Sequence, residues 1–244
     1  MSPEAPTLPN LASQAETPRG EECLVCLNSE SLHDLSSPIN QLCSMTDLIL
    51  AKYKGNLDAE AQLLFGFIQG SAARLQNLLA GLRTYFAVME TGGPPRRCSG
   101  EDLLRGALAS LELRAKEAGA VVTHAPLPEL DCDPNQITFL FASLIDNAIK
   151  FHGREPPHIH IDVASADRSW VLSVRDNGIG IDPRHHESIF GVFKRVYKDG
   201  FPGVGMGLAI ALRIVERHKG RIRIESVPDE GTTVIIELPK KPSQ

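Results

Sequence analysis

The stretch Phe201-Pro-Gly-Val-Gly-Met-Gly-Leu208 leads directly into an apolar segment that is expected to be helical. Its alternate glycines, Gly203, Gly205 and Gly207, let the backbone come close to a ligand where any Cβ would collide. The following helix would point unpaired N–H groups and a positive dipole end at that ligand, which suits a phosphate. Taken alone, the stretch is equally compatible with a flexible loop. It is not the GxGxxG dinucleotide fingerprint, since its last position is leucine.

The composition is that of an ordinary folded protein. Of the 244 residues, 42% are hydrophobic and 23% are charged, and the net charge of −5 provides no general attraction to nucleic acid or acidic lipid. No apolar run approaches the roughly 18–20 residues of a membrane span, and no signal peptide is visible. The five cysteines lack framework spacing, which is typical of a reducing compartment. We therefore expect a cytoplasmic protein that binds neither nucleic acid nor membrane.

The N-terminal segment, residues 1–28, is expected to be disordered because it is rich in Pro, Ser, Thr, Ala and Glu without apolar periodicity. Cys23 and Cys26 form one CxxC, but no second pair stands at the spacing of a zinc site. This segment is also too short for a sensor domain, so any input signal would come from a separate sensor or upstream regulator.

Two heptad patterns predict two long helices within residues 29–91, separated by a stop at Lys54-Gly55-Asn56. The positions of the two heptads, mostly apolar, are Leu32, Leu35, Ile39, Leu42, Thr46, Ile49 and Tyr53, then Leu64, Ile68, Ser71, Leu75, Leu78, Leu82, Phe86 and Met89. Two long helices with a short turn form an antiparallel hairpin. Because one hairpin covers only part of each helix, a four-helix bundle in a homodimer is the expected completion.

Residues 92–97 are expected to be a linker, since the Gly-Gly-Pro-Pro run breaks any helix. Beyond it, residues 98–239 alternate helical and strand patterns, with consecutive strands joined by short turns. This pattern predicts an α+β fold in which helices pack on one face of a mixed sheet. Asp133-Pro134 would begin one helix through an N-cap and a fixed φ angle.

Two polar elements in this second part could bind a ligand. Asn147 and Lys150 lie beside the apolar stripe of the helix that begins at Asp133, where an amide oxygen suits a hard cation and a lysine suits phosphate. Asp176 ends an apolar strand and could accept a hydrogen bond from a buried donor. Each element also has an ordinary structural explanation, either a solvated helix edge or a strand-ending turn.

The order of the motifs is more specific than any one of them. They are Asn147 with Lys150, Asp176-x-Gly178-x-Gly180, Ile189–Arg195, Gly203–Leu208 and Gly231–Thr233. In this order, the chain resembles the ATP-binding catalytic domain of sensor histidine kinases, within the superfamily shared with gyrase, the mismatch-repair ATPases and the heat-shock chaperones. The segment at residues 183–203 and the helix that follows it look most like those of the bacteriophytochrome-type subgroup.

The resemblance implies an ATP site with Mg²⁺ held by Asn147. The ATP-binding residues that it implies are Asn147, Lys150, Asp176, Gly178, Gly180, Arg195, Gly203, Gly205, Gly207, Leu208 and Thr232. Asp176 would recognise the adenine amino group, whereas Lys150 and Arg195 would neutralise charge on the phosphates.

The first predicted helix carries Leu32-His33-Asp34 followed by Pro38, which is similar to the phosphoacceptor motif of the same family. A neutral imidazole can attack phosphorus, and Asp34 could orient the ring and take its proton. The resemblance makes His33, Asp34 and Ser37 the catalytic residues. Pro38 would bend the helix next to His33.

Several positions depart from the family pattern. Ser36 stands where many members carry arginine, and Ser37 stands where threonine or asparagine is usual, which puts phosphatase activity in question. Ser143 replaces a second asparagine or an acid. Val204 replaces a hydroxyl residue between two glycines. We expect these changes to affect efficiency while leaving the nucleotide site intact.

The predicted function is that of a dimeric protein-histidine kinase, which autophosphorylates His33 and passes the phosphoryl group to a response-regulator aspartate. Two alternatives remain open at this stage. One is a histidine phosphotransferase or pseudokinase that does not turn over ATP. The other is a non-catalytic module in which ATP acts as a conformational switch.

Overall fold

The computed structural model describes residues 29–53, 57–90, 92–197, 201 and 203–240, with only the backbone for residues 29–31, 33 and 89. The expectations about residues 1–28, including Cys23 and Cys26, and about the stop at residues 54–56 lie outside the described residues. None of the described helices is long and apolar enough to cross a membrane.

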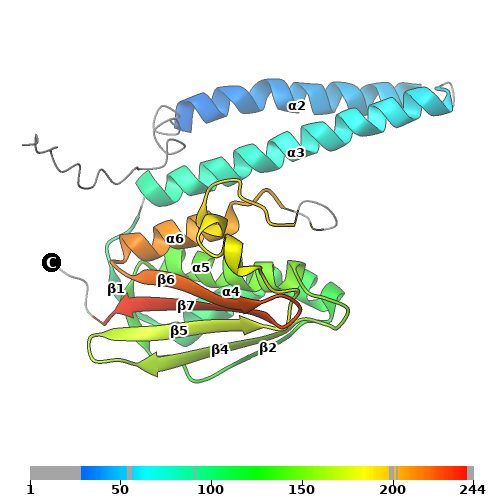
Figure 1. Ribbon diagram of the computed structural model, residues 1–244. Coiled ribbons are helices and arrows are strands. Elements are labelled where there is room, and N and C mark those ends of the chain that lie inside the picture. Colours follow the sequence, from blue (N-terminus) through cyan, green and yellow to red (C-terminus); the bar gives the residue numbers. More distant parts are fainter. Residues whose placement is uncertain (1–28, 54–56, 91, 198–200, 202, 241–244) are drawn as a thin grey trace, which may run out of the picture.

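The first part is an antiparallel helical hairpin of α2 (Ser29–Lys52) and α3 (Ala59–Glu90) (Figure 1). Asp58 begins α3 by accepting a hydrogen bond from the backbone N–H of Ala61 at 2.7 Å. Side-chain hydrogen bonds fix the register of the two helices. They join Gln69 to Asp47, Gln76 to Asn40 and Arg83 to Ser36. The N-terminal end of α2, which carries His33, therefore lies beside the C-terminal part of α3.

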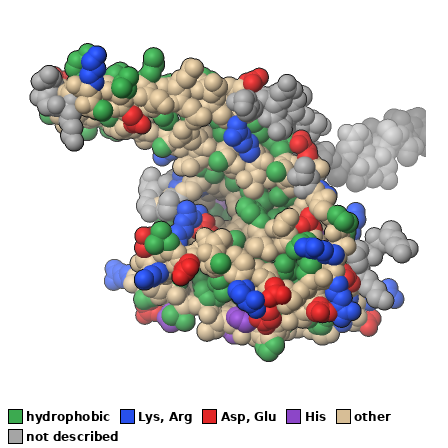
Figure 2. All heavy atoms as spheres, turned by 180° about the vertical axis from the view of Figure 1, so that it is seen from behind, with side chains coloured by type: hydrophobic (Ala, Val, Ile, Leu, Met, Phe, Trp, Pro, Cys, Tyr) green, Lys and Arg blue, Asp and Glu red, His purple; other side chains and the backbone are tan. Residues whose placement is uncertain are grey.

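Much of the predicted apolar seam of the hairpin is exposed in the single chain. Leu42 is 51% exposed and Leu64 is 55% exposed, and Leu35, Ile68 and Leu75 are also exposed. Hydrophobic side chains are visible on the surface of the hairpin in Figure 2. Several large apolar side chains exposed along one helical hairpin are typical of an interaction site.

The second part, residues 96–240, is called the α/β unit here. It contains β1 (Arg96–Ser99), α4 (Gly100–Ala118), β2 (Val121–His124), β3 (Glu129–Cys132), α5 (Pro134–Lys150), β4 (His158–Ser165), β5 (Ser169–Asp176), α6 (Gly207–Arg217), β6 (Arg221–Val227) and β7 (Gly231–Pro239). Two short 3₁₀ turns, η1 (Pro183–His185) and η2 (Ser188–Phe190), lie between β5 and α6.

The main sheet has five strands in the order β2-β4-β5-β7-β6. Only the β2–β4 pair is parallel, so the sheet is mixed, and α4, α5 and α6 cover one of its faces (Figure 1). The predicted α+β fold is therefore confirmed. The antiparallel pair of β1 and β3 was not predicted, because their pairing depends on contacts between residues that are distant in the sequence.

Helix α5 begins as its sequence predicts. The side chain of Asp133 accepts hydrogen bonds from the N–H groups of Asn135 and Gln136, and Pro134 occupies the first turn. Its apolar stripe then packs into the core between sheet and helices, where Ile137, Leu140, Leu144 and Ala148 are buried. This packing fixes which way the polar residues of α5 point.

Helix α3 packs against α6 as well as α2, so it lies between α2 and the α/β unit (Figure 1). Leu82, Tyr85 and Val88 belong to the same buried cluster as the core of the α/β unit. The Tyr85 hydroxyl accepts a hydrogen bond from Arg213 Nε of α6 at 2.9 Å. Gly81 allows close contact, because a Cβ there would lie 2.8 Å from Cγ of Met206.

Candidate nucleotide-binding site

Asp176, the last residue of β5, forms one side of the candidate site. Its Oδ1 accepts hydrogen bonds from the backbone N–H groups of Gly178 at 2.8 Å and Thr232 at 3.0 Å. Burial raises the pKa of the Asp176 carboxyl, and these two N–H donors offset part of that effect. Thr232 thus contacts Asp176 through its backbone, while its hydroxyl contacts Ser226 Oγ at 2.8 Å. The strand end and the β6–β7 turn hold one carboxylate in a fixed orientation.

A second part of the candidate site is formed where α5 meets the start of α6. Ser143 Oγ donates a hydrogen bond to the carbonyl of Gly207 at 3.2 Å. A Cβ on Gly207 would lie 3.1 Å from Ser143 Oγ and 3.3 Å from both terminal atoms of the Asn147 side chain. The amide of Asn147 therefore lies against the first residue of α6, and a larger residue than glycine there would require Ser143 and Asn147 to shift.

The glycine-rich stretch enters α6 along a path that requires glycine. Gly205 has φ +74° and lies against the carbonyl of Lys194, and Gly203 has φ +133°. Leu208 is half-buried against the core. Arg195 Nη2 donates a hydrogen bond to the carbonyl of Phe201 at 2.8 Å. The first N–H groups of α6 are thereby placed next to Asn147, as a phosphate-binding helix terminus requires.

Lys150 is part of an ion-pair network that the sequence analysis missed. Its Nζ pairs with Asp146, whose other oxygen accepts a hydrogen bond from Arg114 of α4 at 2.6 Å. The i, i+4 spacing of Asp146 and Lys150 was the available signal for this pair. To bind a phosphate, the Lys150 ammonium must either leave its ion pair with Asp146 or contact Asp146 and the phosphate together.

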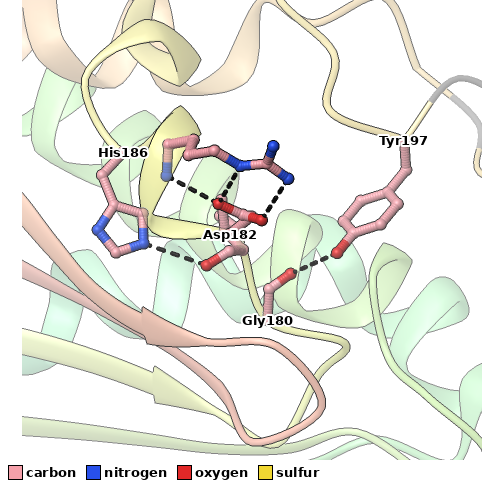
Figure 3. Close-up of polar contacts among 6 residues, drawn as sticks. Gly180, Asp182, His186 and Tyr197 are labelled. Carbon is pink, nitrogen blue, oxygen red and sulfur yellow. Dashed lines mark hydrogen bonds and ion pairs between the residues drawn. The ribbon is translucent and has the colours of Figure 1, made fainter.

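Aromatic residues, also missed, link the glycine-rich stretch to α5. The ring centroid of Phe201 lies 5.1 Å from that of Phe151 and 6.0 Å from that of Tyr197. Figure 3 shows that the Tyr197 hydroxyl points to the carbonyl of Gly180, to which it donates a hydrogen bond of 3.0 Å. This contact fastens the segment between β5 and α6 to the glycines after Asp176.

The base of the same segment is held by two local contacts (Figure 3). Asp182 caps η1 and forms an ion pair with Arg184 at 2.8 Å, and this partner lowers the pKa of the Asp182 carboxyl to about 2. His186 Nε2 lies 3.1 Å from the carbonyl of Ile181, so this nitrogen carries the proton. These contacts shape the turn after Gly180.

The donor set fits a magnesium ion only if the nucleotide supplies most of its ligands. Among the described side chains, no group of three or more His, Cys, Asp or Glu could hold a metal by itself. Magnesium in nucleotide sites is commonly held by one or two protein oxygens together with phosphates and water. The amide oxygen of Asn147, beside the start of α6, suits that role.

The predicted acceptor residues lie on α2, away from this site. His33 is in α2, but its side chain is outside the described part of the structure. Asp34 and Ser37 are exposed, and Ser37 lines a groove of about 770 Å³ on the hairpin. Because α3 lies between α2 and the α/β unit, the structure does not bring the acceptor residues together with Asn147 and Asp176.

Comparison with known proteins agrees with this geometry. Residues 132–242 match the family described as histidine kinase-, DNA gyrase B-, and HSP90-like ATPase. The crystal structure of full-length ShkA in complex with AMPPNP has a similar fold, with a TM-score of 0.64 and 23% identity over 91% of this chain and 46% of that chain.

Among curated proteins, cyanobacterial phytochrome A of Nostoc sp. is 39% identical over 208 residues, which are 85% of this chain and 27% of that protein. Phytochrome-like protein Cph1 of Synechocystis sp. is 36% identical over 85% of this chain and 28% of its own length. The chain thus spans about a quarter of these relatives. It is related to sensor histidine kinases, and its residues 132–242 belong to the histidine kinase-, DNA gyrase B-, and HSP90-like ATPase family.

Proposed function

We propose that the chain is an ATP-dependent protein-histidine kinase, which phosphorylates His33 and then transfers the phosphoryl group to an aspartate of a response regulator. The observation that carries this proposal is the placement of the Asn147 amide against the glycine-lined start of α6. The loop that follows the partly buried Asp176 lies at the end of the same helix α5, because the Ile179 N–H donates a hydrogen bond to the Phe151 carbonyl at 3.0 Å. The relationship to sensor histidine kinases supports the reaction.

In this proposal, residues 98–239 bind ATP and residues 29–91 carry the acceptor, with residues 92–97 as the linker. Asp176 would accept a hydrogen bond from the adenine amino group, and the N–H groups at the start of α6 would hold the phosphates. Asn147 would hold Mg²⁺, which shields phosphate charge when it is bound. Arg195 and Lys150 would exchange their present partners for phosphate oxygens.

The transfer joins a neutral imidazole nitrogen of His33 to the γ-phosphorus as the bond from phosphorus to the ADP oxygen breaks. Asp34 would then accept the imidazole proton, while catalysis rests largely on positioning and charge. Since α3 separates α2 from the α/β unit, we infer that the α/β unit leaves its contact with α3 before transfer, or that it serves the hairpin of a second chain.

A homodimer is part of the proposal. The exposed apolar positions of α2 and α3, such as Leu42 and Leu64, would become buried in a four-helix bundle. This arrangement removes a large apolar surface from water, which is the principal driving force for association.

The proposal is tested by incubating the chain with γ-labelled ATP and Mg²⁺. We expect the label to be acid-labile and base-stable, because a phosphoramidate hydrolyses in acid whereas phosphoserine does not. Nucleotide binding is measured in parallel. If the chain binds nucleotide but takes up no label, the kinase function is contradicted and an ATP-gated module is favoured. If the chain does not bind nucleotide, both functions are contradicted.

The Asp176→Asn variant separates stability from nucleotide binding. Because burial raises the pKa of Asp176, folding disfavours its charged form at neutral pH. Asparagine keeps an oxygen for the Gly178 and Thr232 N–H groups without the charge. We expect a melting temperature at least equal to that of the wild type at neutral pH. ATP affinity should fall about tenfold, because the site loses a charged acceptor.

The stability difference should shrink as the pH falls through the folded-state pKa of Asp176, where the wild-type carboxyl becomes protonated. Thermal melts at neutral and acidic pH measure this change, and nucleotide titration measures the affinity. Asp162→Asn, on the exposed side of β4, is the matched control. A variant that melts well below the wild type at neutral pH would contradict the argument.

A further inference from the structure

The contact between Arg83 and Ser36 gives a cationic group to the acceptor end of the hairpin. Arg83 Nη2 of α3 donates a hydrogen bond to Ser36 Oγ of α2 at 2.9 Å. The Ser36 hydroxyl in turn donates to the carbonyl of Leu32, also at 2.9 Å. Because its proton is used there, the serine oxygen is free to accept from arginine. The guanidinium is thereby fixed above the turn of α2 that contains His33.

The spacing along α2 places Arg83 near the acceptor. His33 and Ser36 are three residues apart, so their Cβ atoms lie about 5–6 Å apart on one side of a helix. Arg83 is exposed, and it lines the hairpin groove together with Ser36 and Ser37. Its guanidinium can hydrogen-bond two phosphoryl oxygens at once, which suits it to a phosphoryl group.

Arg83 differs from the other basic residues of α2 and α3 in its position relative to His33. Glu30 and Asp34 flank His33 on α2, whereas the basic residues of the two helices are Lys52, Arg74 and Arg83. Lys52 is at the far end of α2. Arg74 precedes Arg83 by nine residues, which is about 13 Å along α3. Arg83 is therefore the basic residue of α2 and α3 that stands at the level of His33.

We propose that Arg83 binds the phosphoryl group at His33, supplying from α3 a positive charge that position 36 of α2 lacks. This inference rests on the proposed kinase function. As the phosphoryl group moves from ATP to His33, its oxygens meet the carboxylate of Asp34, and Arg83 offsets that repulsion. Ser36 is a positioning residue, which holds the guanidinium without contacting the phosphoryl group.

The test compares Arg83→Gln, Arg83→Lys and Arg74→Gln in the full chain. We expect Arg83→Gln to lower the rate of His33 labelling at saturating ATP by at least about tenfold, with ATP affinity unchanged. Arg83→Lys keeps the charge without the planar fork and should retain an intermediate rate. Arg74→Gln, on the same helix but away from His33, should label as the wild type does.

A second variant distinguishes a phosphoryl-binding role from a structural one. Adding Ser36→Arg to Arg83→Gln returns a guanidinium to the same turn and should restore most of the rate. Wild-type labelling by Arg83→Gln would overturn the proposal. The proposal would also be overturned if Arg83→Gln labelled slowly, had a lower melting temperature than the wild type, and did not regain its labelling rate when Ser36→Arg was added. Absence of His33-dependent label from the wild type would instead overturn the kinase function, and the role of Arg83 with it.

Discussion

The His33→Gln variant is expected to take up no label from ATP while binding ATP as tightly as the wild type. Glutamine lacks the imidazole nitrogen that must attack phosphorus, yet it is a good helix former and similar in size, so α2 should persist. The proposed nucleotide site is built from α5, α6 and the end of β5, and α3 separates α6 from α2. Acceptor and nucleotide functions should therefore be lost independently.

The measurement is the incorporation of label with time, together with an ATP titration of the same sample. His124→Gln provides the control, because His124 is exposed on the edge strand β2, which pairs with β4 and not with β5. Label persisting in His33→Gln at the wild-type rate would place the acceptor elsewhere. The acid and base stability of that label would then identify the chemical class of the residue.

The Asn147→Asp variant is expected to label at least about 100-fold more slowly than the wild type. A carboxylate there would lie against the first residue of α6, beside the proposed phosphates. Two like charges about 4 Å apart repel by roughly 4 kcal/mol in a partly exposed site, which exceeds a 100-fold change in affinity. A negative charge near a helix N-terminus is favourable without nucleotide, so the variant should remain folded.

Initial labelling rates and ATP titrations check this prediction, with thermal melts to establish folding. Asn135→Asp is a matched control on the same helix, because Asn135 is exposed in the first turn of α5 and distant from Gly207. A variant that labels as fast as the wild type would remove Asn147 from the nucleotide site. Slow labelling by Asn135→Asp would point to a general effect on α5.

Much of the fold follows from local patterns in the sequence. The Asp133-Pro134 start of α5 and its apolar stripe needed only capping chemistry and helical periodicity. The alternation in β4 and β5 was similarly legible, because each strand buries mainly one face. The short strands β1 and β3 were not, since their pairing depends on contacts between distant residues.

In the candidate site, too, some features follow from local sequence patterns and others depend on contacts between distant segments. The order of Asn147, Asp176 and the glycine stretch predicted a nucleotide site, and in the structure Asn147 lies against Gly207 at the start of α6. Partners across elements could not be predicted, such as the hydroxyl of Ser143 on the Gly207 carbonyl or that of Tyr197 on Gly180. Hydrogen bonds of this kind have no sequence period, because each depends on where two separately folded segments meet.

The sequence by itself determined the two helices, the mixed sheet and the types of residue available for phosphate chemistry. It could do so because periodicity, capping and glycine conformations are local properties of the chain. Only the tertiary structure decided that Arg83 reaches Ser36, that Lys150 pairs with Asp146, and that α3 stands between His33 and the nucleotide site. These arrangements depend on the register of two helices and on the burial of Leu82, Tyr85 and Val88 against α6, which arise only when distant segments pack.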